Sequence, residues 1–150
     1  MKKFTCSVDI NAPMHKVVEL WQDPNQLQHW QEGFLGIEPL SGEKGAVGST
    51  MKMRYKMNRS KKEFQLIETI LVNDLPNQFI GQYEGPGMVN TMNSEFQELP
   101  NGMTRWQAEI DYKIIRGFMM KLIAAIAPSM FKRQTQKWLD RFKELVESST

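Results

Sequence analysis

One carboxylate interrupts an alternation of apolar residues in the middle of the chain. Glu68 falls in phase with Leu66 and Ile70, so it shares their face of a predicted strand. A carboxyl group on that face would be partly desolvated, which raises its pKa and suits it to anchoring a ligand or to acting as a general base. Two alternatives compete with such a role. A β-bulge could turn Glu68 outward, or an arginine such as Arg105 or Arg133 could pair with it, and we favour the ion pair.

Aromatic residues with a polar tip occupy similar positions. Alternation places four of them among apolar residues on strand faces: Tyr55, Tyr83, Trp106 and Tyr112. A buried Tyr or Trp needs a hydrogen-bond partner, which could be a ligand oxygen, a water or a backbone carbonyl. For any single residue we favour the water or the carbonyl. Asn90 is a further polar residue on a predicted inward face, where it could orient a ligand or lie at a wet cleft mouth.

Methionine is abundant, with eleven residues in the chain. Five fall on predicted inward strand faces, namely Met51, Met53, Met57, Met88 and Met92. The last predicted helix carries Met119, Met120 and Met130. Methionine side chains are flexible and polarisable, so they suit surfaces that adapt to different apolar guests. The alternative is ordinary filling of a core. We favour a lined pocket by a small margin.

The elements that must position these residues follow from hydrophobic periodicity. Period-two alternation predicts a first strand from Phe4 to Ile10, then two short helices, then six strands separated by short turns. The second strand is expected at about 34–40, and a later one at about 63–75, with Val72 on the inward face. Successive strands joined by short turns form an antiparallel meander. One face is apolar throughout, so the terminal helix must cover it.

After Gly117 the apolar period changes from two to 3.6, which predicts a helix from about Phe118 to Glu147. Pro128 should kink or divide that helix. The segment 118–127 is apolar on nearly all sides, which is typical of a buried helix, a lid over a cavity or a dimer interface.

Composition bounds the classes of protein and partner. The chain has 150 residues, 41% hydrophobic and 24% charged, which is typical of one globular domain. Cys6 is the only cysteine, so no disulfide forms within the chain, and with His15 and His29 it is too few for a closed zinc site. We therefore expect no metal and no cofactor. Neither a signal peptide nor a run of roughly 20 apolar residues is visible, so we expect a cytoplasmic protein.

Charge gives no reason to expect a polyanionic partner, because the net charge is only +2. A basic stretch runs through Lys52, Arg54 and Lys56 and continues to Lys62. On the outer face of a sheet it is typical of a solvated surface. Without interleaved aromatic residues it does not indicate nucleic-acid binding. Docking on an anionic membrane is the less favoured interpretation.

Several short stretches in this order carry a family resemblance. They are Ile10–Pro13, Val17–Trp21, Trp30 with Gly33, Ile67–Thr69, Leu75-Pro76, Phe96–Thr104 and Arg141–Glu147. Together they resemble the START-like (SRPBCC) superfamily, and within it the polyketide cyclase/dehydrase and lipid-transport branch. The resemblance implies an α+β helix-grip fold, in which a curved antiparallel sheet of seven strands wraps around a long C-terminal helix. It also implies a cavity between sheet and helix, entered near the start of that helix.

Three functions remain open. The favoured one is a single-domain binding module for an apolar small molecule such as a lipid or polyketide-like metabolite, acting as a monomer or weak homodimer. Its predicted ligand contacts are Met51, Met53, Tyr55, Phe64, Leu66, Glu68, Tyr83, Met88, Asn90, Met92, Trp106, Ala108, Ile110, Tyr112, Leu122, Ile126 and Met130. The second is a cyclase/dehydrase-type enzyme that transfers protons through Glu68, Tyr55 and Tyr112. The third is a protein-interaction module that uses the apolar start of the last helix.

Overall fold

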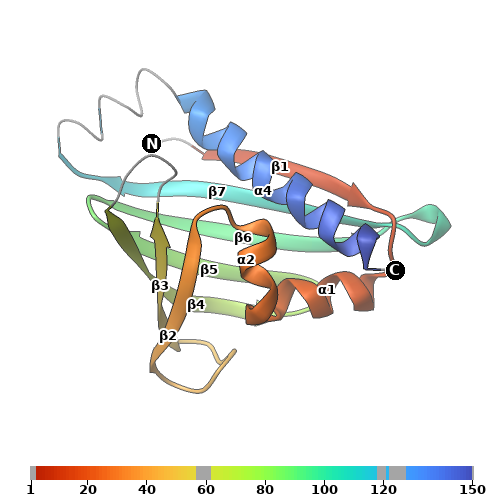
Figure 1. Ribbon diagram of the computed structural model, residues 1–150, viewed down its shortest axis with the longest axis horizontal. Coiled ribbons are helices and arrows are strands. Elements are labelled where there is room, and N and C mark those ends of the chain that lie inside the picture. Colours follow the sequence, from red (N-terminus) through yellow and green to blue (C-terminus); the bar gives the residue numbers. More distant parts are fainter. Residues whose placement is uncertain (1–2, 57–61, 118–120, 122–127, 150) are drawn as a thin grey trace.

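The computed structural model describes residues 3–56, 62–117, 121 and 128–149. In those residues one curved sheet lies behind one long helix and two short ones (Figure 1). The elements are β1 (Lys3–Ile10), α1 (Met14–Gln22), η1 (Pro24–Gln26), α2 (Leu27–Trp30), β2 (Phe34–Ser41), β3 (Thr50–Lys56), β4 (Glu63–Asp74), β5 (Gln78–Gly85), β6 (Met88–Glu98), η2 (Pro100–Gly102), β7 (Thr104–Ile115) and α4 (Pro128–Ser148).

The sheet is antiparallel throughout, with the strand order β1-β7-β6-β5-β4-β3-β2. Strands β2 to β7 therefore form the meander that the sequence predicts, and β1 joins it at the β7 edge. Directly opposed residues in an antiparallel sheet share a face. The inner face, toward α4, can thus be followed from strand to strand through the register.

A bulge in β4 lies beyond Glu68, which stays on the inner face. The β4–β5 register shifts between Ile70 and Val72, so Leu71 is the extra residue and is 40% exposed. Before the bulge the alternation holds Glu68 and Ile70 inward. After it Val72 pairs with Ile80 on the outer face, which corrects the inward position predicted from uninterrupted alternation.

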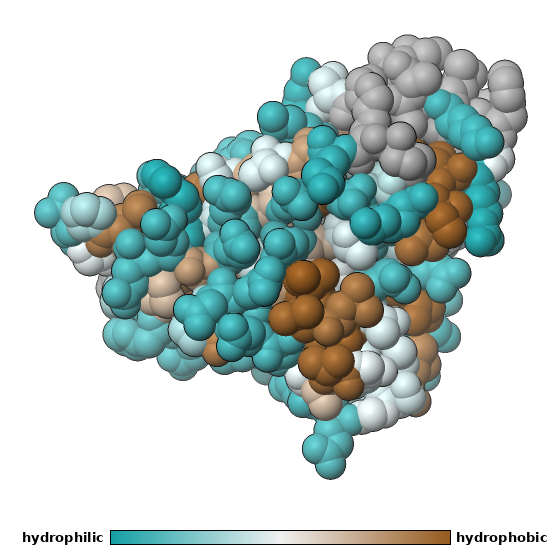
Figure 2. All heavy atoms as spheres, turned by 180° about the vertical axis from the view of Figure 1, so that it is seen from behind, coloured by the Kyte–Doolittle hydropathy of each residue, from teal (hydrophilic) through white to brown (hydrophobic). Residues whose placement is uncertain are grey.

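The outer face of the sheet is seen in Figure 2, where hydrophilic residues predominate around a smaller hydrophobic group. Two of the predicted basic residues there form exposed ion pairs. The Lys52 ammonium lies 3.8 Å from Glu38, and the Arg54 guanidinium lies 3.7 Å from Glu63. Such pairs contribute little to stability, so they are consistent with a solvated surface.

Helix α4 packs against β1, α1 and α2, and the buried core lies between these elements and the inner faces of β6 and β7. Leu139, Phe142 and Val146, which recur at helical spacing, are fully buried on its inner side. Trp30 from α2 lies edge-on to Trp106 at 5.6 Å and to Phe142 at 5.3 Å between ring centroids. Side chains of this size dominate the apolar free energy of a core.

The described part of α4 begins at Pro128. The predicted kink or division of a helix at Pro128 stays a prediction, because residues 118–120 and 122–127 lie outside the described residues. Proline suits the first turn because that position needs no backbone N–H donor. Met130 is 58% exposed, which corrects its predicted inward position. Its neighbour Phe131 lies about 100° further around the helix and packs against the core. Leu122 and Ile126 lie outside the described residues.

Candidate functional site

The inner face of the sheet has two regions that differ in solvent exposure. Near the β6–β7 turn and along β1, inward side chains are buried under α1, α2 and the end of α4; Trp106, Ala108 and Ile110 are between 0% and 4% exposed. Elsewhere on this face six inward side chains of β3 to β6 are half-buried, whereas Met53 and Ile70 of the same strands are buried. We call this second group the inner surface: Met51, Leu66, Tyr83, Met88, Asn90 and Met92.

A polar row crosses the inner face from strand to strand. Glu68 on β4 is opposite Tyr83 on β5, Tyr83 is opposite Asn90 on β6, and Asn90 is opposite Tyr112 on β7. Neighbouring strands lie about 4.8 Å apart, so these four polar residues form one line across the sheet. We call them the polar row. The sequence showed each residue separately, and only the register aligns them.

Glu68 and Tyr83 are in direct contact within this row. The Tyr83 hydroxyl donates a hydrogen bond to Glu68 Oε2 at 2.7 Å, and Glu68 is only 9% exposed. Gly81 makes the contact possible, because a Cβ at that position would lie 2.6 Å from the Tyr83 hydroxyl oxygen. A glycine two residues before Tyr83 therefore leaves room for the phenol to lie along its own strand.

The titration of this pair follows from burial. Desolvation raises the pKa of the Glu68 carboxyl, and the hydrogen bond from Tyr83 opposes this by stabilising the charged form. Burial and the nearby Glu68 carboxyl together raise the pKa of Tyr83 well above its ordinary value. Glu68 thus has the raised pKa that the sequence analysis expected of an inward carboxyl.

The predicted ion pair of Glu68 does not occur in the described part of the chain. Arg105 lies on the outer face, where its guanidinium donates hydrogen bonds of 2.8 and 3.1 Å to the Asp9 carboxylate. Arg133 is exposed on α4. Arg105 pairs with Asp9 because β1 and β7 place those two residues directly opposite each other. Glu68 is therefore not paired with either of these arginines. It is also not turned outward, because the bulge lies beyond it.

Tyr55 is buried beside the site, where it packs against neighbouring elements. It is 3% exposed, and its hydroxyl donates a hydrogen bond to Gln31 Oε1 at 2.7 Å. Its ring stacks on Phe64 at 5.4 Å and on Trp138 of α4 at 6.0 Å between centroids. Burial, followed by the charge of Glu68, raises the pKa of Tyr55. The hydroxyl is therefore held by a protein acceptor and is a poor proton donor at neutral pH.

Gln31 was not recognised from the sequence. It ends α2 and is 8% exposed, so its amide is a buried partner that ties α2 to β3. A single glutamine after a four-residue helix has no periodicity that would predict burial.

Tyr112 closes the other end of the polar row. Its ring contacts Phe4 of β1 at 6.1 Å and Phe131 of α4 at 5.4 Å between centroids. Burial raises the pKa of Tyr112 to about 12. The register separates Tyr112 from Glu68 by two strands, so the structure brings Glu68 to Tyr83 and not to Tyr112.

Trp106 finds its hydrogen-bond partner inside the protein. Its indole N–H donates to the Ser94 hydroxyl at 3.1 Å. Three other buried indoles, those of Trp21, Trp30 and Trp138, have no acceptor for their N–H groups among the described residues. They lie against other aromatic rings, whose faces can accept weak hydrogen bonds.

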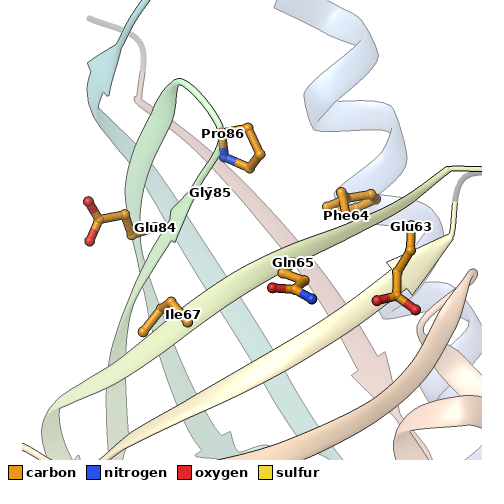
Figure 3. A pocket seen from close by; sticks show the side chains of 7 residues that line it. All are labelled: Glu63, Phe64, Gln65, Ile67, Glu84, Gly85 and Pro86. Carbon is orange, nitrogen blue, oxygen red and sulfur yellow. The ribbon is translucent and has the colours of Figure 1, made fainter.

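A shallow open depression of about 420 Å³ lies where β4 separates from the β5–β6 turn (Figure 3). Its lining residues are Glu63, Phe64, Gln65, Ile67, Glu84, Gly85 and Pro86. The β4–β5 register begins only at Ile67 and Glu84, which leaves a notch between the two strands. A Cβ on Gly85 would lie 2.6 Å from a Leu66 methyl carbon, so Leu66 of the inner surface packs against the inner side of this notch.

Among the described residues, the His, Cys, Asp and Glu side chains form no group of three that could hold a metal ion. None of the described helices is both long and apolar enough to cross a membrane.

Residues 1–147 match the model of the family described as polyketide cyclase / dehydrase and lipid transport. The chain belongs to this family. The match confirms the resemblance drawn from the sequence and extends over nearly all of the chain. A search of curated proteins finds no significant match.

Solved structures of similar proteins share the fold of this family member. A conserved protein from Geobacillus kaustophilus has a TM-score of 0.79 at 14% identity, with 99% of this chain and 97% of that chain covered. The ZhuI aromatase/cyclase from Streptomyces sp. R1128 has a TM-score of 0.75 at 10% identity, with 97% and 93% covered. Ginseng major latex-like protein 151 from Panax ginseng has a TM-score of 0.66 at 13% identity, with 95% of each chain covered. These likenesses confirm the helix-grip architecture.

Proposed function

We propose that this protein binds an apolar small molecule on the inner surface, between the sheet and α4. The observation that carries the proposal is the exposure of the inner face. Four apolar side chains on β3, β4 and β6 are half-buried although they lie on the face toward α4: Met51, Leu66, Met88 and Met92. Inward residues of β7, beside β1, are instead buried by protein, as are Met53 and Ile70. Covering this apolar surface with a ligand is favourable by about 25 cal/mol for each Å² removed from water.

The residue types support the same proposal. Three of the six inner-surface residues are methionines, whose side chains adapt to guests of different shape. The polar row adds a few fixed hydrogen-bonding groups in an apolar setting, which is the usual composition of a small-molecule site. Membership of a family described as polyketide cyclase / dehydrase and lipid transport is consistent with an apolar ligand.

Native mass spectrometry of protein purified from its own organism tests this function first. Solvent extraction then identifies whatever dissociates. We expect an apolar molecule in near-stoichiometric amount. A protein that carries nothing, at the mass of the chain or twice that mass, would argue against a carrier and in favour of a transient substrate or a protein partner.

A variant pair locates the site. Met92→Gln keeps the side-chain length but makes the inner surface more polar, so the affinity for a neutral apolar fluorescent probe such as N-phenyl-1-naphthylamine should fall several-fold. Thr91→Gln is the matched control, because Thr91 is the preceding residue of the same strand and faces outward. Equal affinities in both variants would place probe binding elsewhere.

A second candidate function is proton transfer of the cyclase/dehydrase type. It is favoured by the 2.7 Å contact between Glu68 and Tyr83 and by the raised pKa of the Glu68 carboxyl, a property of many general bases. Glu68→Gln separates the two functions once a ligand is known. A carrier should keep its ligand unchanged, whereas an enzyme should lose turnover and retain binding.

The protein-interaction hypothesis depended on the segment 118–127. Apart from Lys121, that segment lies outside the described residues. The hypothesis stays a prediction, which dilution-dependent molecular size would support.

A further inference from the structure

The polar row differs from the rest of the inner face in its charge. Glu68 is its one carboxylic acid. Two things influence the pKa of this carboxyl: its burial and the hydrogen bond from Tyr83. Residues opposite Glu68 on the adjacent strands are Met51 and Tyr83, and its neighbours in phase on β4 are Leu66 and Ile70. Within the described part of the chain, the seven ion pairs all exclude Glu68.

Hydrogen-bonding capacity remains on this carboxyl. Tyr83 donates to Oε2, and the described residues supply no donor to Oε1. Tyr55 is close enough for its pKa to be affected by Glu68, but its proton is directed to Gln31. Oε1 of this inward carboxyl therefore has acceptor capacity that a bound molecule can satisfy.

The rows on either side of Glu68 are apolar. Toward the β6–β7 turn the register aligns Ile70, Gly81, Met92 and Ile110, and toward the β5–β6 turn it aligns Met88 with Ile115. A ligand on this face would meet apolar surface along most of its length and polar groups along one line. Its polar group must then complement an acid, a phenol and an amide.

We propose that the ligand of the inner surface presents a hydrogen-bond donor, a hydroxyl or a protonated amine, to Glu68, and that the site rejects carboxylates. This inference rests on the proposed function, because it names the chemical class bound at the same site. A donor satisfies Glu68 Oε1. A carboxylate would place a second negative charge beside a buried carboxyl that has no basic partner in the described structure, and two such groups cannot both ionise without a large cost.

Three probes with the same alkyl chain test the inference: 1-octanol, octylamine and octanoate. Each is measured near neutral pH by displacement of N-phenyl-1-naphthylamine from the unmodified protein. We expect 1-octanol and octylamine to bind at least about tenfold more tightly than octanoate, since one unit of pKa perturbation corresponds to a factor of ten. Octanoate binding as tightly as 1-octanol would overturn the inference while leaving the proposed function in place.

Glu68→Gln then assigns the discrimination to this residue. The variant removes the charge and keeps the shape, so octanoate should gain affinity and 1-octanol should change little. Glu95→Gln is the control, because Glu95 is an exposed acid on β6. A preference that persists unchanged in Glu68→Gln would overturn the role of Glu68. Failure of N-phenyl-1-naphthylamine and all three probes to bind would instead overturn the proposed function itself.

Discussion

Replacing Glu68 with glutamine should change the way stability depends on pH. Burial raises the pKa of this carboxyl in the folded protein above its ordinary value of 4.5. The folded state therefore holds the proton at pH values where the unfolded chain has released it. The contribution of Glu68 to the free energy of unfolding therefore falls as pH rises from 4.5 to the folded-state pKa.

The size of the effect follows from proton linkage. One proton held by the folded state and not by the unfolded state changes the free energy of unfolding by at most about 1.4 kcal/mol per pH unit. Glutamine does not titrate. The free energy of unfolding of Glu68→Gln minus that of the unmodified protein should therefore rise across this window and become constant above it. Below pH 4.5 only the pH-independent cost of the amide remains.

Urea unfolding followed by tryptophan fluorescence at a series of pH values measures this difference. The pH-independent effects of the substitution, such as an amide N–H without an acceptor, cancel when two pH values are compared. Glu95→Gln serves as the exposed control and should show no comparable slope. A difference that stays flat, or that falls as pH rises, would refute a buried carboxyl with a raised pKa.

Three further substitutions test the contacts around the site. Gly81→Ala should destabilise the protein by about 1–2 kcal/mol in urea unfolding. The added methyl displaces the Tyr83 hydroxyl, and losing its hydrogen bond to Glu68 costs more than is gained by restricting the backbone of the unfolded chain. In a double-mutant cycle, Gln31→Leu and Tyr55→Phe should show a coupling energy of about 1–2 kcal/mol, and additive effects would mean that their 2.7 Å hydrogen bond contributes nothing. Phe142→Ala should cost about 3–5 kcal/mol through the cavity it leaves, and a cost below about 1 kcal/mol would contradict its place at the centre of the core.

Local periodicity was sufficient to predict the elements and the fold class. Period-two alternation on β3 and β7, turn residues between the strands and the 3.6-residue stripe on α4 each depend on a few neighbouring residues. The continuous apolar face of the sheet predicted that the terminal helix covers it. These are local properties of the chain, so they can be recognised without knowing which distant residues they contact.

Predictions that extended a local pattern through an irregularity were wrong. Val72 was placed inward because alternation was assumed to continue, but the bulge at Leu71 reverses it. Met130 was counted with the inner residues, although the helical phase of α4 leaves it exposed. A bulge is decided by pairing with the adjacent strand, and the phase of a helix by the surface on which it packs.

The sequence by itself determined that this chain forms a meander of strands closed by a C-terminal helix, and that Glu68 and three tyrosines interrupt its apolar faces. Tertiary structure decided which of them meet. Register places Glu68 beside Tyr83, and the packing of α2 gives Tyr55 its partner Gln31. Hydrogen bonds between strands and helices join residues far apart in the chain, and their distances depend on how the elements pack, which no short stretch of sequence encodes.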